Sequence, residues 1–580
     1  MRDQTPIFEL QFSIAATFFV LLALSFSAGV SRANAQSQSD LAKVSPDLQS
    51  PAAKQGLDFS VGKRGLDSLS FNGQSLFRSA QSGELQPWKS VFRAVLDALL
   101  SNPSPSVQVA KKPVSSIDLA YPWGHLACAY AKKGETLTMR IEVSNTGAQE
   151  IDELSLRLME LNFPSAPNGG TLEAGMFGFG FKGTMHPLYQ YPSVVDPQFV
   201  APIVRVDFGT GALNFCSDDL KCSLSVPYST NPPANTGYPF IISCRGIMPG
   251  ETKTFNVSLR FGPAGSRVQD LAHDVLNRYA EKYPFQIKWT DRRPIGAIFL
   301  ASSGIKVATN RRRWILNSGK IDVTTEEGRV GFRAALLEMA DNSIKVLKGA
   351  NAQGMITWDL EGEEFLEACY YGDPRLTPTL APEMEFKNTD ERSVIDEYFE
   401  KFRAAGLRTG ICIRPQQISM IDGKPVQQAA DDGHATKILK EKIVYAKRRW
   451  GCTLFYVDST ATVSGPINPD VFRTVAEAYP DILLIPENES MRYFAYSAPF
   501  NSYVHHKVTS TPAGARAVYP KAFSVLMAPD GDRPEDHSAL VNAIRNGDIL
   551  LFNGWYSNAG AVKIKGLYGE ASRRVAADGR

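Results

Sequence analysis

The chain has 580 residues, a formal net charge of +2 at pH 7, 43% hydrophobic residues and 21% charged residues. This length is sufficient for two or more domains with their own hydrophobic cores. The nearly balanced charge argues against a nucleic-acid-binding groove or an acidic tail, and we expect neutral partners and no nucleic acid.

An apolar segment near the N-terminus, residues 12–30, is followed by a small-x-small motif at residues 33–35, of the kind that signal peptidase cleaves. Residues 1–35 are therefore predicted to be a signal peptide. The mature protein is predicted to be secreted or periplasmic, or associated with the cell surface, with no membrane contact after cleavage. Asp3 and Glu9 make the region before the segment atypical, so an uncleaved membrane anchor is the alternative.

The cysteines show neither a CxxC pair nor a zinc-site spacing, and they number seven: Cys128, Cys216, Cys222, Cys244, Cys369, Cys412 and Cys452. Cys216 and Cys222 flank a predicted turn, so they could form a hairpin disulfide in an oxidising compartment. Buried free thiols are the alternative there, and they are the prediction for Cys412 and Cys452.

The first half of the chain has the pattern of an all-β domain. Residues 36–56 are polar and predicted to be a flexible lead-in, and residues 57–285 are predicted to form a β-sandwich. This prediction depends on short alternating runs separated by turn residues, at 136–144, 154–158 and 254–261. A helix is expected within this domain at residues 88–100. The dense aromatic residues at 176–191 are expected in its core or domain interface rather than in a sugar-stacking platform.

The second half, residues 286–580, is predicted to be a (β/α)8 TIM barrel, reached through a linking helix at 268–283. Eight strand-like runs alternate with helical segments: 295–300, 354–358, 408–413, a run ending at Asp458, a run ending at Glu487, a segment within 498–505, 522–527 and 548–552. The helices expected between them cover 327–349, 390–405, 435–449, 469–479 and 538–546. The absence of a glycine-rich phosphate loop after the first strand argues against a doubly wound sheet.

Two of these runs end in a carboxylate, Asp458 and Glu487, which are 29 residues apart in sequence. This separation is about one βαβ unit, so neighbouring strands are predicted to present both acids at the rim where barrel enzymes build active sites. Paired carboxylates on one rim are what glycosidic bond cleavage requires. The alternative is that each acid only caps the helix that follows it.

Other polar and aromatic residues near the strand ends are candidates for substrate binding: Trp358, Asp359, Glu361, Arg414, His505, Asp530 and Trp555. The Arg414 guanidinium could hold Asp458 ionised or bind a sugar hydroxyl, and a purely structural ion pair is the alternative. Only one of His505 and His506 can point into the site, because adjacent strand residues face opposite sides.

An Asp at the end of the fourth strand and a Glu at the end of the fifth resemble the alpha-amylase superfamily and the endo-alpha-N-acetylgalactosaminidase-type hydrolases. The resemblance implies that Asp458 is the nucleophile and Glu487 the acid/base. Alpha-amylases have an Arg two positions before the nucleophile, whereas Tyr456 stands here, which argues against an ordinary starch-acting enzyme. The segment at residues 356–362 also resembles uncharacterised secreted bacterial proteins of glycosidase-like fold.

We therefore expect a secreted glycoside hydrolase that cleaves an O-glycosidic bond with retention of configuration, and carboxyl groups roughly 5 to 5.5 Å apart. The expected substrate is an oligosaccharide, polysaccharide or glycoconjugate, with no cofactor and no metal. One alternative is a metal-dependent barrel hydrolase with an oxygen-rich site drawn from Asp359, Glu361, Asp458, Glu487 and His505. A second is a non-catalytic carbohydrate-binding or surface protein on the same fold.

Overall fold

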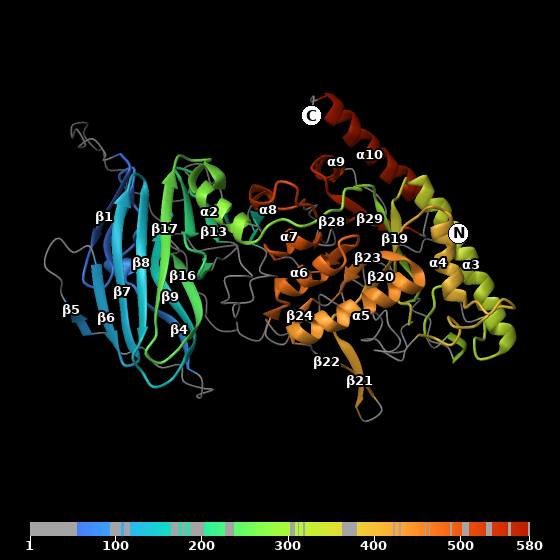
Figure 1. Ribbon diagram of the computed structural model, residues 1–580. Coiled ribbons are helices and arrows are strands. Elements are labelled where there is room, and N and C mark those ends of the chain that lie inside the picture. The colour runs from blue at the N-terminus through green and yellow to red at the C-terminus, as the bar shows by residue number, and fades with distance from the viewer. Residues whose placement is uncertain are drawn as a thin grey trace, which may run out of the picture.

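The computed structural model has antiparallel sheets in the first part of the chain and a parallel sheet in the second, side by side (Figure 1). It describes residues 55–92, 106–108, 116–163, 173–176, 180–181, 184–185, 202–226, 237–301, 308–310, 312–316, 320–361, 380–421, 424–428, 431–458, 460–462, 465–487, 490–501, 510–528, 536–554 and 558–577. The predicted signal peptide and nearly all of the predicted lead-in lie outside these ranges. None of the described helices is long and apolar enough to cross a membrane.

The first part contains one eight-stranded and one four-stranded antiparallel sheet. The larger has the order β10-β13-β14-β17-β8-β7-β6-β5, the smaller β15-β16-β9-β4, and a three-stranded sheet β1-β2-β3 adjoins them. Their bounds are β1 Leu57–Val61, β2 Leu66–Phe71, β3 Gln74–Ser75, β4 Gln86–Phe92, β5 Ser106–Gln108, β6 Ser116–Tyr121, β7 Gly124–Lys133, β8 Thr136–Asn145, β9 Ile151–Asn162, β10 Glu173–Met176, β13 Ile203–Asp207, β14 Ala212–Ser217, β15 Ser223–Ser225, β16 Gly237–Ile247 and β17 Thr252–Gly262. Two short strands, β11 Gly180–Phe181 and β12 Thr184–Met185, form a separate pair.

These two sheets share one hydrophobic core. In β8 every second side chain is buried, including Leu137, Met139 and Ile141, as a strand with one core face requires. Leu154 of β9 and Phe240 of β16 belong to the same buried cluster, so the smaller sheet contributes the other side of the core. The prediction that the first part of the chain is built from β-sheets is therefore confirmed.

The helix predicted at residues 88–100 is wrong over the part that the structure describes. Residues 86–92 form the strand β4, in which Lys89, Ser90 and Val91 pair with Ser155, Leu154 and Glu153 of β9. Pairing with a neighbouring strand decides the conformation here, because local preference is weak compared with sheet hydrogen bonds and burial. Residues 93–100 and most of the aromatic run at 176–191 lie outside the described residues.

The second part is a nearly closed parallel barrel. Its eight-stranded sheet has the order β26-β23-β20-β19-β18-β29-β28-β27, and every pairing in it is parallel. The outermost strands of this order, β26 and β27, are joined by a hydrogen bond of 2.9 Å from the backbone N–H of Ala498, just before β27, to the carbonyl of Leu484. The bounds are β18 Ile295–Phe299, β19 Gly354–Trp358, β20 Thr409–Ile413, β23 Cys452–Val457, β26 Leu483–Pro486, β27 Phe500–Asn501, β28 Val525–Met527 and β29 Ile549–Asn553.

Helices separate these strands along the chain. The predicted ones are α3 Glu326–Gly349, α4 Val394–Ala404, α5 Asp432–Trp450, α6 Pro469–Ala478 and α9 His537–Arg545, and those not predicted are α7 Tyr493–Tyr496, α8 Ala513–Val518 and α10 Asn558–Ala577. The helices α7 and α8 are short, so this side of the barrel is less regular. Two hairpins not predicted from the sequence follow β20 and β23, and the one after β20 projects from the barrel: β21 Gln417–Ile421 with β22 Lys424–Gln428, and β24 Ala461–Thr462 with β25 Gly465–Pro466.

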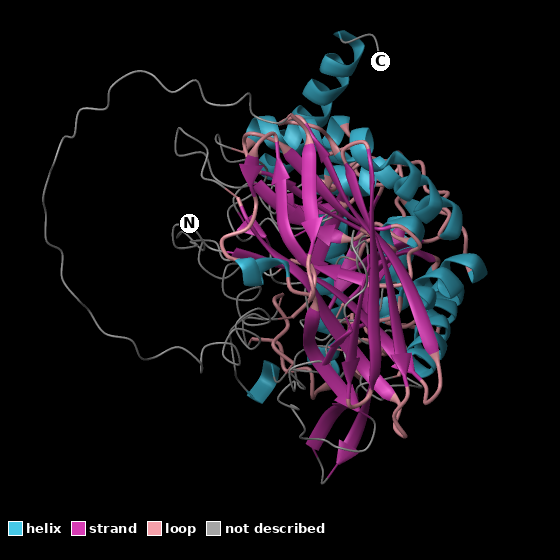
Figure 2. Cartoon of the chain, turned by 90° about the vertical axis from the view of Figure 1, so that its left-hand side faces the viewer, coloured by secondary structure: helices cyan, strands magenta, loops and turns pink. Residues whose placement is uncertain are grey.

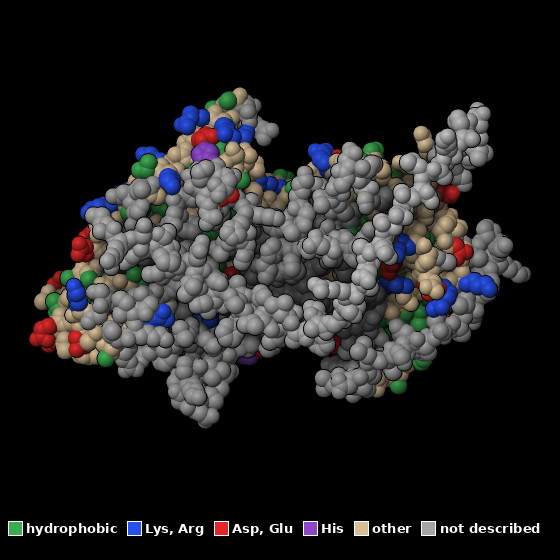
Figure 3. All heavy atoms as spheres, turned by 180° about the vertical axis from the view of Figure 1, so that it is seen from behind, with side chains coloured by type: hydrophobic (Ala, Val, Ile, Leu, Met, Phe, Trp, Pro, Cys, Tyr) green, Lys and Arg blue, Asp and Glu red, His purple; other side chains and the backbone are tan. Residues whose placement is uncertain are grey.

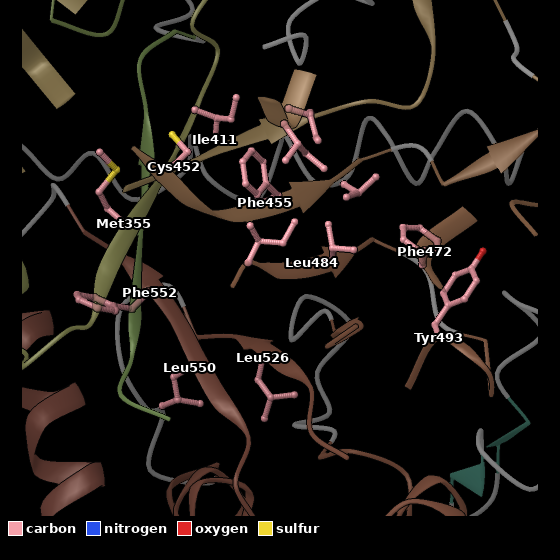
Figure 4. Packing of buried hydrophobic residues seen from close by; sticks show 14 of the residues in the cluster. Met355, Ile411, Cys452, Phe455, Phe472, Leu484, Tyr493, Leu526, Leu550 and Phe552 are labelled. Atoms are coloured by element: carbon pink, nitrogen blue, oxygen red, sulfur yellow. The ribbon is translucent and has the colours of Figure 1, made fainter. Parts of the chain in front are cut away.

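Alternating side chains of the barrel strands enter two different cores. Phe455, Leu484 and Leu550 pack outward against the helices, together with Phe472 of α6 and Tyr493 of α7 (Figure 4). A separate cluster, which we call the barrel interior, contains the strand residues between them: Ile295, Ala297, Phe299, Ile356, Trp358, Cys412, Leu454, Tyr456, Leu483, Ile485, Phe500, Val525, Met527, Ile549 and Leu551. The barrel is therefore filled by side chains rather than hollow.

The predicted linking helix is confirmed as α2, Val268–Lys282, and it packs between the two parts. The Tyr519 hydroxyl donates to the carbonyl of Tyr283 at 2.8 Å, and the Arg492 guanidinium lies 4.1 Å from the centre of the Tyr283 ring. Arg492 also forms an ion pair of 2.6 Å with Asp470. In a view from the antiparallel sheets, strands lie in front and most helices behind them (Figure 2).

The six cysteines that the structure describes are free and buried. Cys216 and Cys222 are therefore not joined, and the disulfide alternative is wrong in this structure. The Ser217 hydroxyl lies 3.4 Å from the Cys222 sulfur, and burial raises the pKa of both thiols. Burial likewise raises the pKa of Cys452 to about 12, which makes its thiolate scarce at neutral pH.

We predict that these six thiols do not react with a disulfide reagent such as DTNB at pH 8 while the protein is folded. Unfolding in guanidinium without reductant should expose all six, because the burial that shields them is lost. The Cys369→Ser variant removes the one cysteine outside the described residues and makes the count unambiguous. Four exposed thiols instead of six would show that Cys216 and Cys222 pair in the purified protein.

Candidate active site

A layer of four aromatic rings crosses the barrel interior below the carboxyl ends of its strands. Phe299 stacks on Trp358 with 4.9 Å between ring centres, and Trp358 lies 5.2 Å from Tyr456. Tyr456 in turn lies nearly perpendicular to Phe500, with 5.2 Å between the ring centres. These rings come from β18, β19, β23 and β27, so they form an apolar floor for whatever lies one layer above.

Asp458 occupies that next layer. Leu454 and Tyr456 of β23 point into the barrel interior, while Phe455 and Val457 point outward to the helices. The backbone N–H of Asp458 still bonds to the carbonyl of Ile413 at 2.9 Å, so the alternation continues and turns its side chain inward. Asp458 is 9% exposed, which leaves its carboxylate at the boundary of the apolar interior.

Glu487 lies beside Asp458 on the neighbouring strand. In β26, Leu483 and Ile485 point into the barrel interior, so the same alternation directs Glu487 inward. Its backbone N–H donates to the carbonyl of Val457 at 2.9 Å, and Val457 is paired in register with Pro486. Asp458 and Glu487 are therefore the next pair in the ladder, and Glu487 is half-buried.

Arg414 forms an ion pair with Asp458. Its Nε donates to Oδ2 at 2.7 Å, and both side chains are largely buried. Arg414 follows β20, where Cys412 points into the barrel interior, so the arginine enters the acid layer from the other neighbouring strand. This contact fits both a guanidinium that acts on Asp458 and the purely structural ion pair, so both stay open, and sugar binding by Arg414 stays a prediction.

The end of β19 brings two further predicted acids close to the barrel. Asp359 has φ of 63°, a left-handed conformation that is costly for a residue with a side chain, and it is 3% exposed. This turn ends the strand alternation, so Leu360 packs with the outward core and Glu361 is buried as well. Trp358, predicted to stack on a sugar, is 5% exposed and packs in the aromatic floor.

The remaining predicted site residues, His505, Asp530 and Trp555, lie outside the described residues, and their roles stay predictions. Asn553 is a candidate that we did not predict. It ends β29 in register with Ala297, and alternation from Leu551 turns it inward. The signal for it in the sequence was the same as for Asp458, a polar residue at the end of an apolar run, but an amide is a weaker indication of chemistry than a carboxylate.

The electrostatic character of the described surface is mixed. On the face shown in Figure 3, Lys and Arg side chains are interspersed with Asp and Glu side chains over the part of the surface that is described. No group of three or more His, Cys, Asp or Glu side chains that could hold a metal ion occurs among the described residues. The metal-dependent alternative also requires His505, which lies outside them.

No family model matches the sequence, and no curated protein matches it either. Several solved structures are similar in fold. An alpha-N-acetylgalactosaminidase from Bifidobacterium bifidum, in its Gal-NHAc-DNJ complex, has 10% identity and a TM-score of 0.53, with 90% of this chain and 92% of that chain covered. Its quadruple mutant has 11% identity and a TM-score of 0.51, with 89% and 92% covered.

A GH31 family sulfoquinovosidase from E. rectale gives 9% identity, a TM-score of 0.47, and coverage of 90% of this chain and 83% of that chain. The two alpha-N-acetylgalactosaminidase structures are those of a glycoside hydrolase, and at such identities the likeness shows the fold alone. The multidomain combination of β and α/β parts predicted from the sequence is therefore that of known glycosidase structures. The likeness does not support the alpha-amylase or endo-type part of the predicted resemblance.

The left-handed conformation of Asp359 predicts an unusual order of stabilities. Asp359→Gly and Asp359→Ala both remove the carboxylate, but only glycine adopts this φ without strain, so the glycine variant should be more stable by about 1 kcal/mol. Thermal unfolding followed by circular dichroism measures the difference. The same two changes at Asp341, inside helix α3, should give the opposite order. Equal stability of the two Asp359 variants would contradict the left-handed turn.

Proposed function

We propose that this chain is a glycoside hydrolase that cleaves an O-glycosidic bond with retention of configuration. Asp458 would be the nucleophile and Glu487 the acid/base. The observation that supports this most directly is the parallel register of β23 with β26, which ends at Val457 and Pro486, because strand alternation would then turn Asp458 and Glu487 inward side by side above the barrel interior. Adjacent strands are about 4.8 Å apart, so carboxyl groups on neighbouring strands are able to approach to the separation of about 5 to 5.5 Å that is typical of retaining enzymes.

The proposed reaction has two steps. Asp458 attacks the anomeric carbon while the bond to the leaving oxygen breaks, and Glu487 gives its proton to that oxygen. We assign the attack to Oδ1, because Oδ2 accepts the hydrogen bond from Arg414. Water then gives a proton to Glu487 and attacks the glycosyl-enzyme, which releases the sugar and restores Asp458.

The aromatic floor supports this chemistry in the proposed scheme. Trp358 and Tyr456 keep water out from below, so an ion pair between Arg414 and Asp458 acts in a medium of lower dielectric than bulk water. Arg414 thus orients the carboxylate before substrate arrives. We also infer that the nearly closed barrel is an irregular member of the (β/α)8 class, preceded by a β-sandwich.

The proposed substrate is a carbohydrate, and the signal-like N-terminus favours export of the protein. Because the solved structures of similar fold include an alpha-N-acetylgalactosaminidase, aryl N-acetyl-α-galactosaminides are the first substrates to test. Their β-anomers, and aryl α- and β-glycosides of other sugars, complete the screen. A protein that binds sugars but hydrolyses none of these would favour the non-catalytic alternative.

We predict that Asp458→Asn abolishes hydrolysis and that Glu487→Gln lowers kcat by about 10² to 10⁴-fold, the usual contribution of a general acid/base. Asp390→Asn and Glu338→Gln, exposed acids on the same part of the chain, are the matched controls and should keep full activity. Hydrolysis is measured by release of the aryl alcohol. Full activity in Asp458→Asn would exclude the proposed nucleophile.

Rescue by azide separates the two roles. With Asp458→Ala, azide takes the place of the carboxylate and should give a glycosyl azide of inverted configuration from an activated aryl glycoside. With Glu487→Ala, azide attacks the glycosyl-enzyme and should give the retained anomer. NMR of the product identifies the configuration. The opposite assignment of anomers would mean that the two acids exchange roles.

A further inference from the structure

Helix α5 contains a lysine, Lys442, with 0% of its surface exposed. An ammonium group is expensive to bury, so such a lysine requires hydrogen-bond partners. Its Nζ donates to the carbonyl of Arg414 at 2.8 Å and to that of Gln416 at 2.9 Å. Leu439 and Ile443, fully buried on the same helix, fix the position of α5 against the barrel.

The two carbonyls belong to the segment that connects β20 with the projecting hairpin. Strand β20 ends at Ile413 and β21 begins at Gln417, so residues 414–416 form the connection between the two strands. Carbonyls in a buried connection need donors, and the helix outside the barrel supplies them here through one side chain. Arg414 is thereby held on both sides, by its carbonyl outward and by its guanidinium inward to Asp458.

We propose that Lys442 is a positioning residue for Arg414 and, through Arg414, for the Asp458 carboxylate. This inference rests on the proposed function, since it assigns Lys442 a role in the attack by Asp458. Lys442 does not touch the reacting atoms. Its contribution is to hold the backbone of residues 414–416 in the position from which Arg414 Nε lies 2.7 Å from Asp458 Oδ2.

The test replaces Lys442 by Met, which has a similar length and no donor. We expect kcat per folded molecule to fall by up to about 10²-fold with little change in KM, because misplacement of a reacting group by about 1 Å costs that much. Near-UV circular dichroism measures the folded fraction. Lys437→Met, an exposed lysine on the same helix, is the matched control and should leave kcat unchanged.

The double variant decides whether Lys442 acts through Arg414. If it does, Lys442→Met combined with Arg414→Lys should have the kcat of Arg414→Lys alone. The proposal would be overturned if the loss of kcat in the double variant equalled the product of the two single losses. It would also be overturned if Lys442→Met kept the wild-type kcat per folded molecule. If the methionine variant does not fold, Lys442→Gln, which keeps one donor group, is measured in the same way.

A structural measurement keeps this proposal separate from the proposed function. A crystal structure of Lys442→Met, or of Lys442→Gln if methionine prevents folding, should show that the hydrogen bond of 2.7 Å from Arg414 Nε to Asp458 Oδ2 has lengthened or broken. An unchanged hydrogen bond would contradict the inference even if the enzyme is active. If the variant breaks this hydrogen bond but the wild-type protein hydrolyses no glycoside, the proposed function alone is contradicted.

Discussion

The register between β23 and β26 is the constraint on which the candidate site depends. Leu454 pairs with Leu483, Tyr456 with Ile485 and Val457 with Pro486, which makes Asp458 and Glu487 the next pair. A slip of one residue in either strand would turn one acid outward to the helices, because side chains alternate strictly along a strand. The same slip would expose bulky apolar side chains, so the register that packs the barrel interior is also the register that aligns the two acids.

The interior of the barrel explains why the charged residues gather where they do. Below the acid layer every inward position of β23 and β26 is apolar: Leu454, Tyr456, Leu483 and Ile485. Charges cannot be placed among these side chains without a large desolvation cost. The first inward positions at which a carboxylate can meet both water and a guanidinium are those of Asp458 and Glu487, at the carboxyl ends of the strands.

Much of this arrangement was predictable from the sequence, because apolar residues recur with a different period along the strands and along the helices of a barrel. Strand β19 has the predicted bounds, and α5 begins next to its cap at Asp431, whose side chain accepts from the backbone N–H of His434. The helix predicted at 88–100 is wrong at residues 88–92, because β9 provides a strand partner there that the local sequence does not reveal. The left-handed turn at Asp359 and the buried state of Lys442 leave no local pattern, since each follows from contacts between distant segments.

The arginine beside Asp458 shows how packing restricts which residue can form an ion pair with that acid. The residue two positions before an inward-pointing acid also points inward, one layer lower, and here that residue is Tyr456 in the aromatic floor. A guanidinium at that position would replace a ring that touches both Trp358 and Phe500. Arg414 instead follows the neighbouring strand β20 and enters the acid layer itself, where it reaches Asp458 without disturbing the floor. Strand β23 thus has Tyr456 where alpha-amylases have an arginine, and Arg414, after the neighbouring strand β20, supplies the guanidinium instead.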